Sequence, residues 1–387
     1  MLYEKNPSKY FEKWSGLKEP LSSQSLISLG IADMDYKAPQ QVIDKLNEIV
    51  RFGIYSNVIR PESYYNSIIS WIKKRYNWEI KKEWINTATR IIPSIGFAIR
   101  ALTKKGDKII IQTPVYDGFS KIILKSEREV VTNPLIFKNN KYYMDYADLE
   151  IKAQDPRVKI LILCNPHNPV GRVWTEEELR KMGELCLRHE IIVICDQAYS
   201  DLTYSIYKYT PFASISKDFA QNCVVCRSLS KPFNLAGLHT AYVIIPKKSL
   251  FNAYDRVLES LHLKRSSLLS VVATEVAYEE GEIWLNEIKE YTHENLQFMK
   301  DFIESEMPMV NVIEPEFAFL AWLDLRKLKI TSHKGAFFEE KARVLINDGT
   351  MYGEGGEGFI RVNIACSRET LRAALERIKN AINTYHY

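Results

Sequence analysis

The sequence has little cysteine and no long apolar run. Six cysteines in 387 residues are too few for a disulfide framework, and most of them lie in apolar segments typical of a reduced core. Residues 1–10 have no apolar stretch, so we expect no signal peptide. The longest apolar runs, such as Ile160–Cys164, have the length of a strand and are too short to cross a membrane. We therefore expect a cytoplasmic protein.

A charge excess is also missing. The 52 basic and 48 acidic residues leave a net charge of +4, which favours neither a nucleic acid nor a membrane as a partner. No metal site is expected either. Cys223 and Cys226 form a Cys-x-x-Cys pair on a probable strand, where side chains three apart point to opposite faces. With 46% hydrophobic residues, the chain has an ordinary globular composition and the length of one large α/β unit or two domains.

From about residue 84 to 246, short β-rich runs alternate with helical patterns. The runs expected to be strands are 108–112, 159–164, 191–195, 223–226 and 241–245. Continuous apolar strands separated by helices predict a mostly parallel sheet with both faces covered. One helix is expected over 175–190, where Thr175 and Glu178 can form a capping box.

The remaining sequence predicts a second, smaller unit. Residues 247–305 have the pattern of long helices. Beyond about residue 307, strand patterns at 317–324 and 359–363 and two amphipathic helices predict a smaller α+β domain. The expected division is an N-terminal segment 1–45 that packs with the small domain, a large domain 46–285 and a small domain 286–387.

The most informative run is Arg227–His239, which contains Lys231 just past the expected strand 223–226. A lysine at such a position can be partly desolvated, which lowers its pKa and makes the amine a usable nucleophile. The hydroxyls of Ser228 and Ser230 can hydrogen-bond a phosphate. An amine beside a phosphate seat meets the needs of pyridoxal phosphate (PLP), which forms a Schiff base at one end and needs an anion anchor at the other.

Polar residues follow four of the expected strands. Tyr116 comes after the first, Asn168 after the second, Asp196 and Tyr199 after the third, and Lys231 after the fourth. Ligands of open parallel sheets bind at the carboxyl ends of the strands. We therefore expect these side chains to meet at one edge.

Each of these residues has a chemical role and a structural alternative. Asp196 can pair with a protonated pyridine nitrogen, because a buried carboxylate needs a cation, or it can be a helix N-cap. Asn168 can donate to the cofactor phenolate oxygen, as can Tyr199, although Asn168 also fits a turn before proline. Tyr116 can stack on the ring or be a half-buried aromatic residue. Arg361 can fork onto an α-carboxylate or lie on a strand surface.

Six segments carry a family likeness, and the block that ends at Trp174 is highly specific. They are Ile31–Asp35, Thr113–Tyr116, Leu163–Trp174, Ser230–Gly237, Tyr352–Gly358 and Arg361–Ala365. In these segments the chain resembles the fold type I PLP enzymes, and within them the C-S lyases that are similar to cystathionine β-lyase. The likeness extends from about residue 25 to the end.

The resemblance implies a PLP-dependent transferase-like α/β fold and a homodimer with active sites at the subunit interface. It implies Lys231 as the Schiff-base lysine, with the strand-end residues and Arg361 in the roles given above. Residues and resemblance together give a catalytic set of Lys231, Tyr116 and Tyr199, a cofactor set of Lys231, Asp196, Asn168, Tyr199, Tyr116, Ser228, Ser230, Arg90 and Ile91, and a substrate set of Arg361, Ala32, Asn168 and Asn57.

The chain departs from the family pattern at three places. Asn57 stands where the family has a tyrosine that reaches the partner's active site. Arg90 replaces a glycine that lets a helix N-terminus approach the phosphate. Tyr199 is similar to the aminotransferase version, although His239 stands where aminotransferases have an arginine. We hypothesise that Arg90 supplies a charged phosphate contact that compensates for Asn57, although its bulk can also narrow the seat.

The resemblance favours β-elimination over two alternatives. With Lys231 as the base for the Cα proton, loss of a thiolate from Cβ gives a thiol, pyruvate and ammonia. Return of the proton at C4′ gives transamination instead, so a class I/II aminotransferase stays open. A PLP-fold regulator fits less well, because about 25 leading residues leave no room for a DNA-binding domain. We expect a C-S lyase acting on a sulfur-containing L-amino acid.

Overall fold

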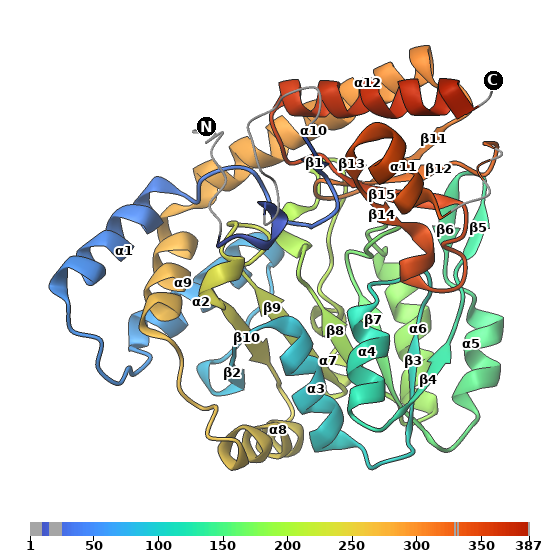
Figure 1. The fold of residues 1–387 in the computed structure, drawn as a ribbon. Helices are drawn as coiled ribbons and strands as arrows, with labels where there is room; N and C mark the ends of the chain where they lie inside the picture. The colour runs from blue at the N-terminus through green and yellow to red at the C-terminus, as the bar shows by residue number, and fades with distance from the viewer. Residues whose placement is uncertain (1–9, 15–24, 329, 331–332, 386–387) are drawn as a thin grey trace.

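The computed structural model describes residues 10–14, 25–328, 330 and 333–385. The expectation for residues 1–10 therefore lies, apart from Tyr10, outside the described residues. The chain forms a large α/β unit that is topped by a smaller α+β unit (Figure 1).

A seven-stranded sheet is the centre of the large unit. Its strands, in spatial order, are β2 (Ile85–Ala88), β10 (Ala241–Ile244), β9 (Cys223–Ser228), β8 (Ile192–Asp196), β7 (Val158–Cys164), β3 (Lys108–Ile111) and β4 (Glu129–Thr132). Strand β10 runs antiparallel to both of its neighbours, and the other pairs are parallel. The predicted mostly parallel sheet is confirmed, while the edge strands β2 and β4 were not predicted.

Helices cover both faces of this sheet, and each face has its own apolar core. On one face lie α3 (Ile91–Leu102), α4 (Gly118–Lys125) and α8 (Lys248–Ser260); on the other lie α2 (Glu62–Tyr76), α6 (Glu176–Arg188), α7 (Lys217–Gln221) and α9 (Leu268–Glu280). Cys223 and Cys226 fall into different cores, as expected for residues three apart on a strand. The capping box of Thr175 and Glu178 is present at the start of α6.

The smaller unit is built on a four-stranded antiparallel sheet. Its strands in order are β11 (Asn311–Ile313), β12 (Leu320–Asp324), β15 (Phe359–Asn363) and β14 (Asn347–Asp348). Its helices are α10 (Glu282–Glu306), which rises from the large unit, α11 (Lys334–Ala342) and α12 (Arg368–Tyr385) (Figure 1). Near the N-terminus, β1 (Ile27–Ser28) pairs in parallel with β13 (Val344–Leu345).

Other elements connect these layers. Helix α5 (Tyr146–Ala153) packs against α6, and β5 (Ile136–Lys138) forms a hairpin with β6 (Lys141–Tyr143). Helix α1 (Gln40–Phe52) packs on α9.

The predicted domain borders both fall inside helices. The border at 45/46 lies within α1, and the border at 285/286 lies within α10. The three-part division with these borders stays a prediction.

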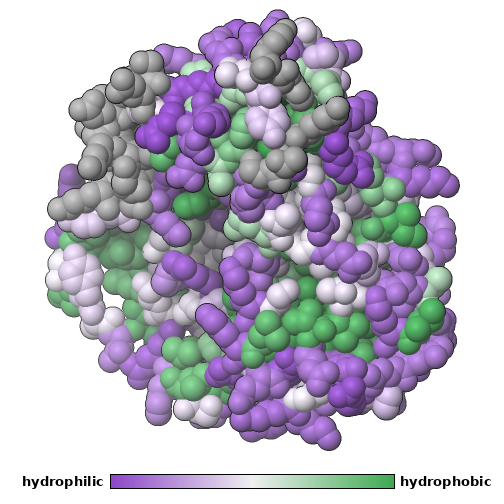
Figure 2. Space-filling view, turned by 45° about the vertical axis from the view of Figure 1, so that its right-hand side comes forward, coloured by the Kyte–Doolittle hydropathy of each residue, from purple (hydrophilic) through white to green (hydrophobic). Residues whose placement is uncertain are grey.

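In the described part of the chain, no helix is both long and apolar enough to cross a bilayer. Within the same residues, no three His, Cys, Asp or Glu side chains gather in a way that could hold a metal ion. Hydrophilic residues dominate the face seen in Figure 2, and apolar residues gather in its lower half.

Candidate active site

Lys231 lies at the carboxyl edge of the large sheet, three residues past β9. Its Nζ donates to the Ala32 carbonyl at 2.8 Å and contacts Oδ1 of Asp33 at 3.1 Å. Burial lowers the pKa of the Lys231 amine, and the charges of Arg361 and Arg90 lower it further, while Asp33 opposes the change. Desolvation of this kind is what makes a lysine nucleophilic near neutral pH.

Asp196 ends β8 and is buried. Its Oδ1 accepts a hydrogen bond from the Ala198 backbone at 2.9 Å, which is a turn contact and not a helix cap. Burial raises the pKa of Asp196 to about 6, against the opposing effects of that hydrogen bond and of Lys231. A buried carboxylate with such weak compensation gains from a cationic partner, so it suits a protonated pyridine nitrogen.

Arg361 is buried on β15 and is not a surface arginine. Its Nη1 donates to Oδ1 of Asn168 at 3.1 Å, and its Nη2 donates to the Gly30 carbonyl at 2.7 Å. Its Nε is buried without a hydrogen-bond partner among the described residues. The guanidinium therefore joins three distant segments and keeps a donor for an anion, as an α-carboxylate site requires.

The loop that contains Pro114 and Val115 is held near Arg361 by hydrogen bonds to His167 and Tyr352. His167 Nε2 donates to the Pro114 carbonyl at 3.0 Å, and burial lowers the pKa of this imidazole to about 4, so it stays neutral. The Val115 amide donates to the Tyr352 carbonyl at 2.9 Å. These contacts place Tyr116, which is 38% exposed and meets Phe119 edge to face, beside the Asn168 loop.

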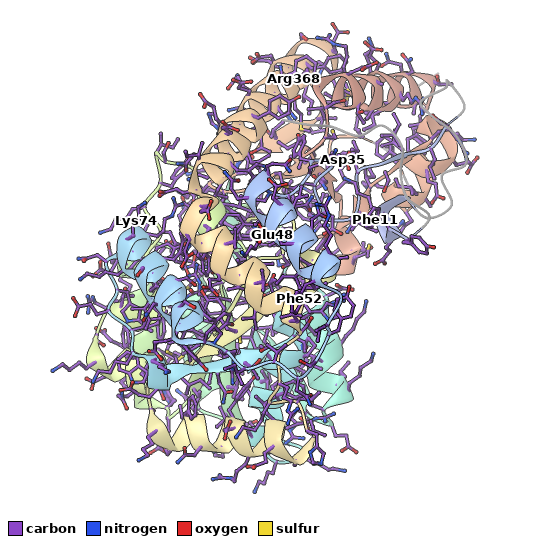
Figure 3. The ribbon with its side chains drawn as sticks, turned by 90° about the vertical axis from the view of Figure 1, so that its left-hand side faces the viewer. Phe11, Asp35, Glu48, Phe52, Lys74 and Arg368 are labelled. Atoms are coloured by element: carbon purple, nitrogen blue, oxygen red, sulfur yellow. The ribbon has the colours of Figure 1, made fainter. Side chains whose placement is uncertain are left out.

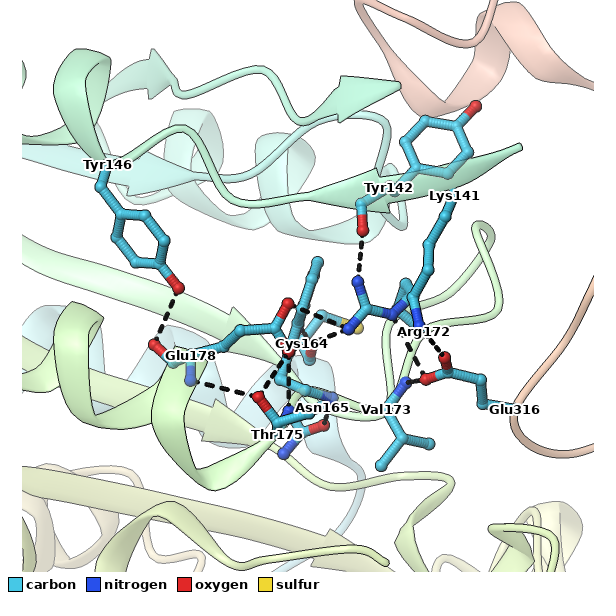
Figure 4. Close-up of polar contacts among 11 residues, drawn as sticks. Lys141, Tyr142, Tyr146, Cys164, Asn165, Arg172, Val173, Thr175, Glu178 and Glu316 are labelled. Atoms are coloured by element: carbon cyan, nitrogen blue, oxygen red, sulfur yellow. Dashed lines mark hydrogen bonds and ion pairs between the residues drawn. The ribbon is translucent and has the colours of Figure 1, made fainter. Parts of the chain in front are cut away.

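The highly specific sequence block serves partly as an anchor between the two units (Figure 4). Arg172 contacts Glu178 at 2.9 Å and Glu316 at 3.3 Å. Glu316 also accepts from the Val173 amide at 2.6 Å and pairs with Lys141 at 3.0 Å. Because Glu316 lies just before β12, this network holds the Asn168 loop against the smaller unit.

Tyr199 is buried against Phe317 and Phe319, with ring centroids 5.4 and 6.2 Å away. Burial raises the pKa of its phenol far above the usual value. The phenol therefore stays protonated at neutral pH and can donate its proton in a hydrogen bond. This state agrees with the predicted donor role, which stays a prediction.

The Ser228 hydroxyl, which was expected to contact the phosphate, is hydrogen-bonded within the protein. Its hydroxyl donates to the Thr240 carbonyl at 2.8 Å and accepts from the Ser230 amide at 3.1 Å. The single hydroxyl proton is thus used within the protein, and a donation to phosphate requires the side chain to turn. Ser230 is only half-buried, so its hydroxyl remains the more accessible of the two.

Arg90 caps α3 in an extended backbone conformation, with φ −150° and ψ 162°, which any residue adopts. The position therefore does not require the family glycine. Arg90 is exposed. Burial is the main cause that lowers the pKa of His239 and of Lys231, and the charge of Arg90 lowers both further. Ile91 follows as a buried first residue of α3, while Asn57 is exposed in the irregular stretch after α1.

The sequence prediction missed two asparagines that hold the segment Gly30–Asp35, one from the smaller unit and one from the large unit. Asn363 Nδ2 donates to the carbonyls of Ile31 and Asp33, both at 2.7 Å. Asn234 Nδ2 donates to the Met34 carbonyl at 3.1 Å. Both asparagines lie inside segments that carry the family resemblance, so the resemblance could have pointed to them. The asparagine side chain alone did not indicate which carbonyls it binds.

The same segment is fixed from the N-terminal side by Lys13. Its buried Nζ donates to the Asp33 carbonyl at 2.9 Å and pairs with Asp35 at 2.7 Å. Asp35 lies between α1 and the smaller unit (Figure 3). Burial raises the pKa of Asp35, and Lys13 offsets this effect. Nothing in the sequence around Lys13 predicted this contact.

Comparison with known proteins shows likeness along nearly the whole chain. A cystathionine β-lyase of Bacillus subtilis, PatB, is 36% identical over 372 residues, 96% of each chain. A Clostridium difficile protein, provisionally described as an aminotransferase and solved with PLP bound, superposes with a TM-score of 0.93 at 40% identity and covers 99% of this chain and 100% of that one. The PLP-bound C-S lyase of Staphylococcus hominis superposes with a TM-score of 0.88 at 34% identity, over 92% and 91% of the two chains.

These similarities confirm the predicted fold and the predicted family resemblance. The family described as aminotransferase class I and II matches residues 24–378. The chain therefore belongs to the class I and II aminotransferase family.

Proposed function

We propose that the protein is a PLP-dependent C-S β-lyase that acts on a sulfur-containing L-amino acid, such as cystathionine or a cysteine S-conjugate. The observation that carries this proposal is the electrostatic interaction of Lys231 with two buried charged groups: Asp196 at the carboxyl edge of the large sheet and Arg361 on β15 of the smaller unit. The likeness to proteins named cystathionine β-lyase and C-S lyase supports the choice of reaction.

The residues present suit PLP. When bound, PLP supplies an electron sink for the charge that develops at Cα of an amino acid. Lys231 would hold its aldehyde carbon, and Asp196 would hold the ring nitrogen and gain the cation that its buried charge lacks. Asn168 and Tyr199 would donate to the phenolate oxygen. Tyr116 would lie against the ring.

The remaining groups would handle the substrate. Arg361 would fork onto the α-carboxylate, near Asn168 and the backbone of Ala32. The Lys231 amine would take the Cα proton, and the electron pair left on Cα would expel the sulfur from Cβ. Burial raises the pKa of the Tyr116 phenol, so this group is protonated and can return a proton to the sulfur. Addition of one water to the remaining fragment gives pyruvate and ammonia.

The test is product analysis without a keto acid. The purified protein with PLP is incubated with L-cystathionine, L-cysteine and an S-alkyl cysteine, and pyruvate and free thiol are measured. We expect equal amounts of pyruvate and thiol from at least one substrate. If turnover of each substrate requires an added keto acid, the lyase assignment is wrong.

An aminotransferase is the second candidate, because Tyr199 stands in an aminotransferase-like segment and the Clostridium difficile relative carries that description. The same assay separates the two candidates by its dependence on a keto acid. Asn57→Tyr then tests whether the family tyrosine at this position changes the ratio of elimination to transamination.

A homodimer is the proposed assembly. Five apolar side chains at the end of α1 and in the stretch after it, Val50, Phe52, Ile54, Tyr55 and Ile59, are between 49% and 81% exposed. Figure 3 shows Phe52 at the free end of α1. Such a group suits burial against a second copy. Sedimentation should give a dimer, and Phe52→Asp with Ile59→Asp should give a monomer.

A cytoplasmic location and an Arg90–phosphate contact complete the proposal. All six cysteines are buried and unpaired, which suits a reducing compartment and can be tested by cell fractionation. The charge of Arg90 acts on Lys231 and His239, so it lies within reach of a group bound there. Arg90→Ala should weaken PLP binding about tenfold, measured by fluorescence titration. An unchanged dissociation constant would show that Arg90 does not hold the phosphate.

A further inference from the structure

The strongest unassigned contact at the site is the one between Lys231 and Asp33. The Lys231 Nζ lies 3.1 Å from Asp33 Oδ1 and 2.8 Å from the Ala32 carbonyl, so both of its partners belong to one short segment. The two side chains are 23% and 35% exposed, so this pair is partly shielded from water.

The segment that carries Asp33 is held rigidly. Its carbonyl at position 33 accepts from both Asn363 and Lys13, at 2.7 and 2.9 Å. The following residues are tied to Asn234. Side chains from three separate parts of the chain thus donate to backbone carbonyls of this segment and hold the Asp33 carboxylate beside the lysine. An incidental surface contact would not need such support.

The other charges around Lys231 make this carboxylate important. The guanidinium groups of Arg361 and Arg90 both act against a positive charge on the amine, and burial does so more strongly. Asp196 also interacts electrostatically with Lys231, and its own partner in the proposed function is the ring nitrogen. Asp33 is therefore the group that can compensate an ammonium at position 231.

We propose that Asp33 is a positioning residue for Lys231, whose amine it holds whenever that amine is not condensed with the cofactor. The inference rests on the proposed function, because that function gives Lys231 its chemistry. When the amine takes the Cα proton, a C–H bond breaks, an N–H bond forms and the electron pair stays on Cα. The new ammonium donates a hydrogen bond to Asp33, and the proton remains on nitrogen. Asp33 thereby makes the lysine a stronger base and keeps it in place.

The test measures how readily the amine reacts with an aldehyde as the pH changes. Full-length protein is freed of cofactor as its oxime and mixed with saturating pyridoxal phosphate at pH 6 to 10. Adducts are trapped with borohydride, and the peptide that contains Lys231 is quantified. Asp33→Asn should lower the midpoint of the capture profile by about one pH unit, which corresponds to up to about tenfold faster capture below that midpoint.

Three variants separate this role from a merely structural one. Asp33→Glu should restore most of the wild-type midpoint, because it keeps the charge. Asp117→Asn is the control and should leave the midpoint unchanged. Asp117 pairs with Lys121, so the substitution removes a negative charge near the site without removing a contact to Lys231. In the complete enzyme, Asp33→Asn should also move the acid limb of the kcat profile to lower pH and reduce its plateau.

The outcomes distinguish the inference from the function on which it rests. If wild type forms the adduct at Lys231 but Asp33→Asn has the same midpoint, Asp33 does not hold the amine and the inference is overturned. If wild type forms no adduct at Lys231 at any pH, the proposed function fails and the inference falls with it. Circular dichroism confirms that each variant compared is folded.

Discussion

Two basic side chains lie four residues apart, Arg227 near the end of β9 and Lys231 just beyond it, and their surroundings differ. Arg227 is almost fully buried and donates to Asp201 at 2.8 Å, to Gln197 at 2.9 Å and to the Tyr76 hydroxyl at 3.3 Å. Lys231 has one carbonyl and one partly exposed carboxylate.

The difference separates a scaffold charge from a chemical one. A guanidinium cannot lose its proton near neutral pH, so a buried arginine must be fully paired. Burial lowers the pKa of Arg227, but Tyr76 and Asp201 outweigh this effect and raise it above its usual value. An ammonium with few partners responds to its surroundings, and its pKa falls. Arg227 thus has several hydrogen-bond acceptors around its charge, whereas Lys231 contacts one carbonyl and one carboxylate.

The sharpest way to test the contrast is to remove Lys231. Lys231→Ala should reduce lyase turnover by at least about 10³-fold, because nucleophile and base are lost together. The free energy of unfolding should change by less than about 1 kcal/mol, since few contacts disappear. Pyruvate release and urea unfolding measure the two effects. A large loss of stability would mean that Lys231 is also a scaffold charge.

Removal of Arg227 should have the opposite result. Arg227→Met leaves the carboxylate of Asp201 buried without its cation, which should cost about 3–5 kcal/mol of unfolding free energy. Urea unfolding measures this loss. The double variant Arg227→Met with Asp201→Asn is the matched control and should recover part of it, because no unpaired charge remains. A loss below about 1 kcal/mol for the single variant would contradict the scaffold role.

Asp196 should behave like Lys231 and not like Arg227. Its pKa of about 6 lies above the usual 3.8, so the folded protein without cofactor gains stability as this carboxyl is protonated. The ionised form costs up to about 3 kcal/mol above pH 6, and this cost vanishes below pH 4. Asp196→Asn should therefore be more stable than wild type at pH 8 and equal to it near pH 4, while it loses activity. Equal stability at both values would refute the assignment.

Arg361 lies between the two extremes, since it is buried like Arg227 but its Nε has no hydrogen-bond partner in the described part of the chain. Arg361→Lys should raise KM for an amino acid substrate about 10- to 100-fold, because a lysine cannot fork onto a carboxylate. The change in kcat should be smaller. Steady-state kinetics measure both constants, and a substrate analogue that lacks the α-carboxylate should show no such difference.

Several elements of the fold could be read from local pattern alone. The capping box of Thr175 and Glu178 predicted the start of α6, and the apolar runs predicted five strands of the central sheet. The edge strands β2 and β4 were missed because they are short and β4 is only partly buried. The domain borders at 45/46 and 285/286 stay predictions, and α1 and α10 continue through them.

The candidate site shows the same limit at the level of single residues. Polar residues after parallel strands must meet at one edge, so Asp196 and Lys231 were predictable from their positions. Ser228 has the right position for a phosphate contact, yet its hydroxyl is bound to Thr240. Which partner a hydroxyl takes depends on short-range geometry, which no sequence pattern encodes.

The sequence by itself determined the sheet, the family and the residues at the strand ends, because periodicity and local motifs set these features. Only the tertiary structure decided that Asp33 meets Lys231 across 198 residues and that Lys13 holds the segment that contains Asp33. Contacts of that kind depend on how two units pack against each other. Local sequence governs helices, strands and their order, whereas the packing of distant segments decides which charge faces which.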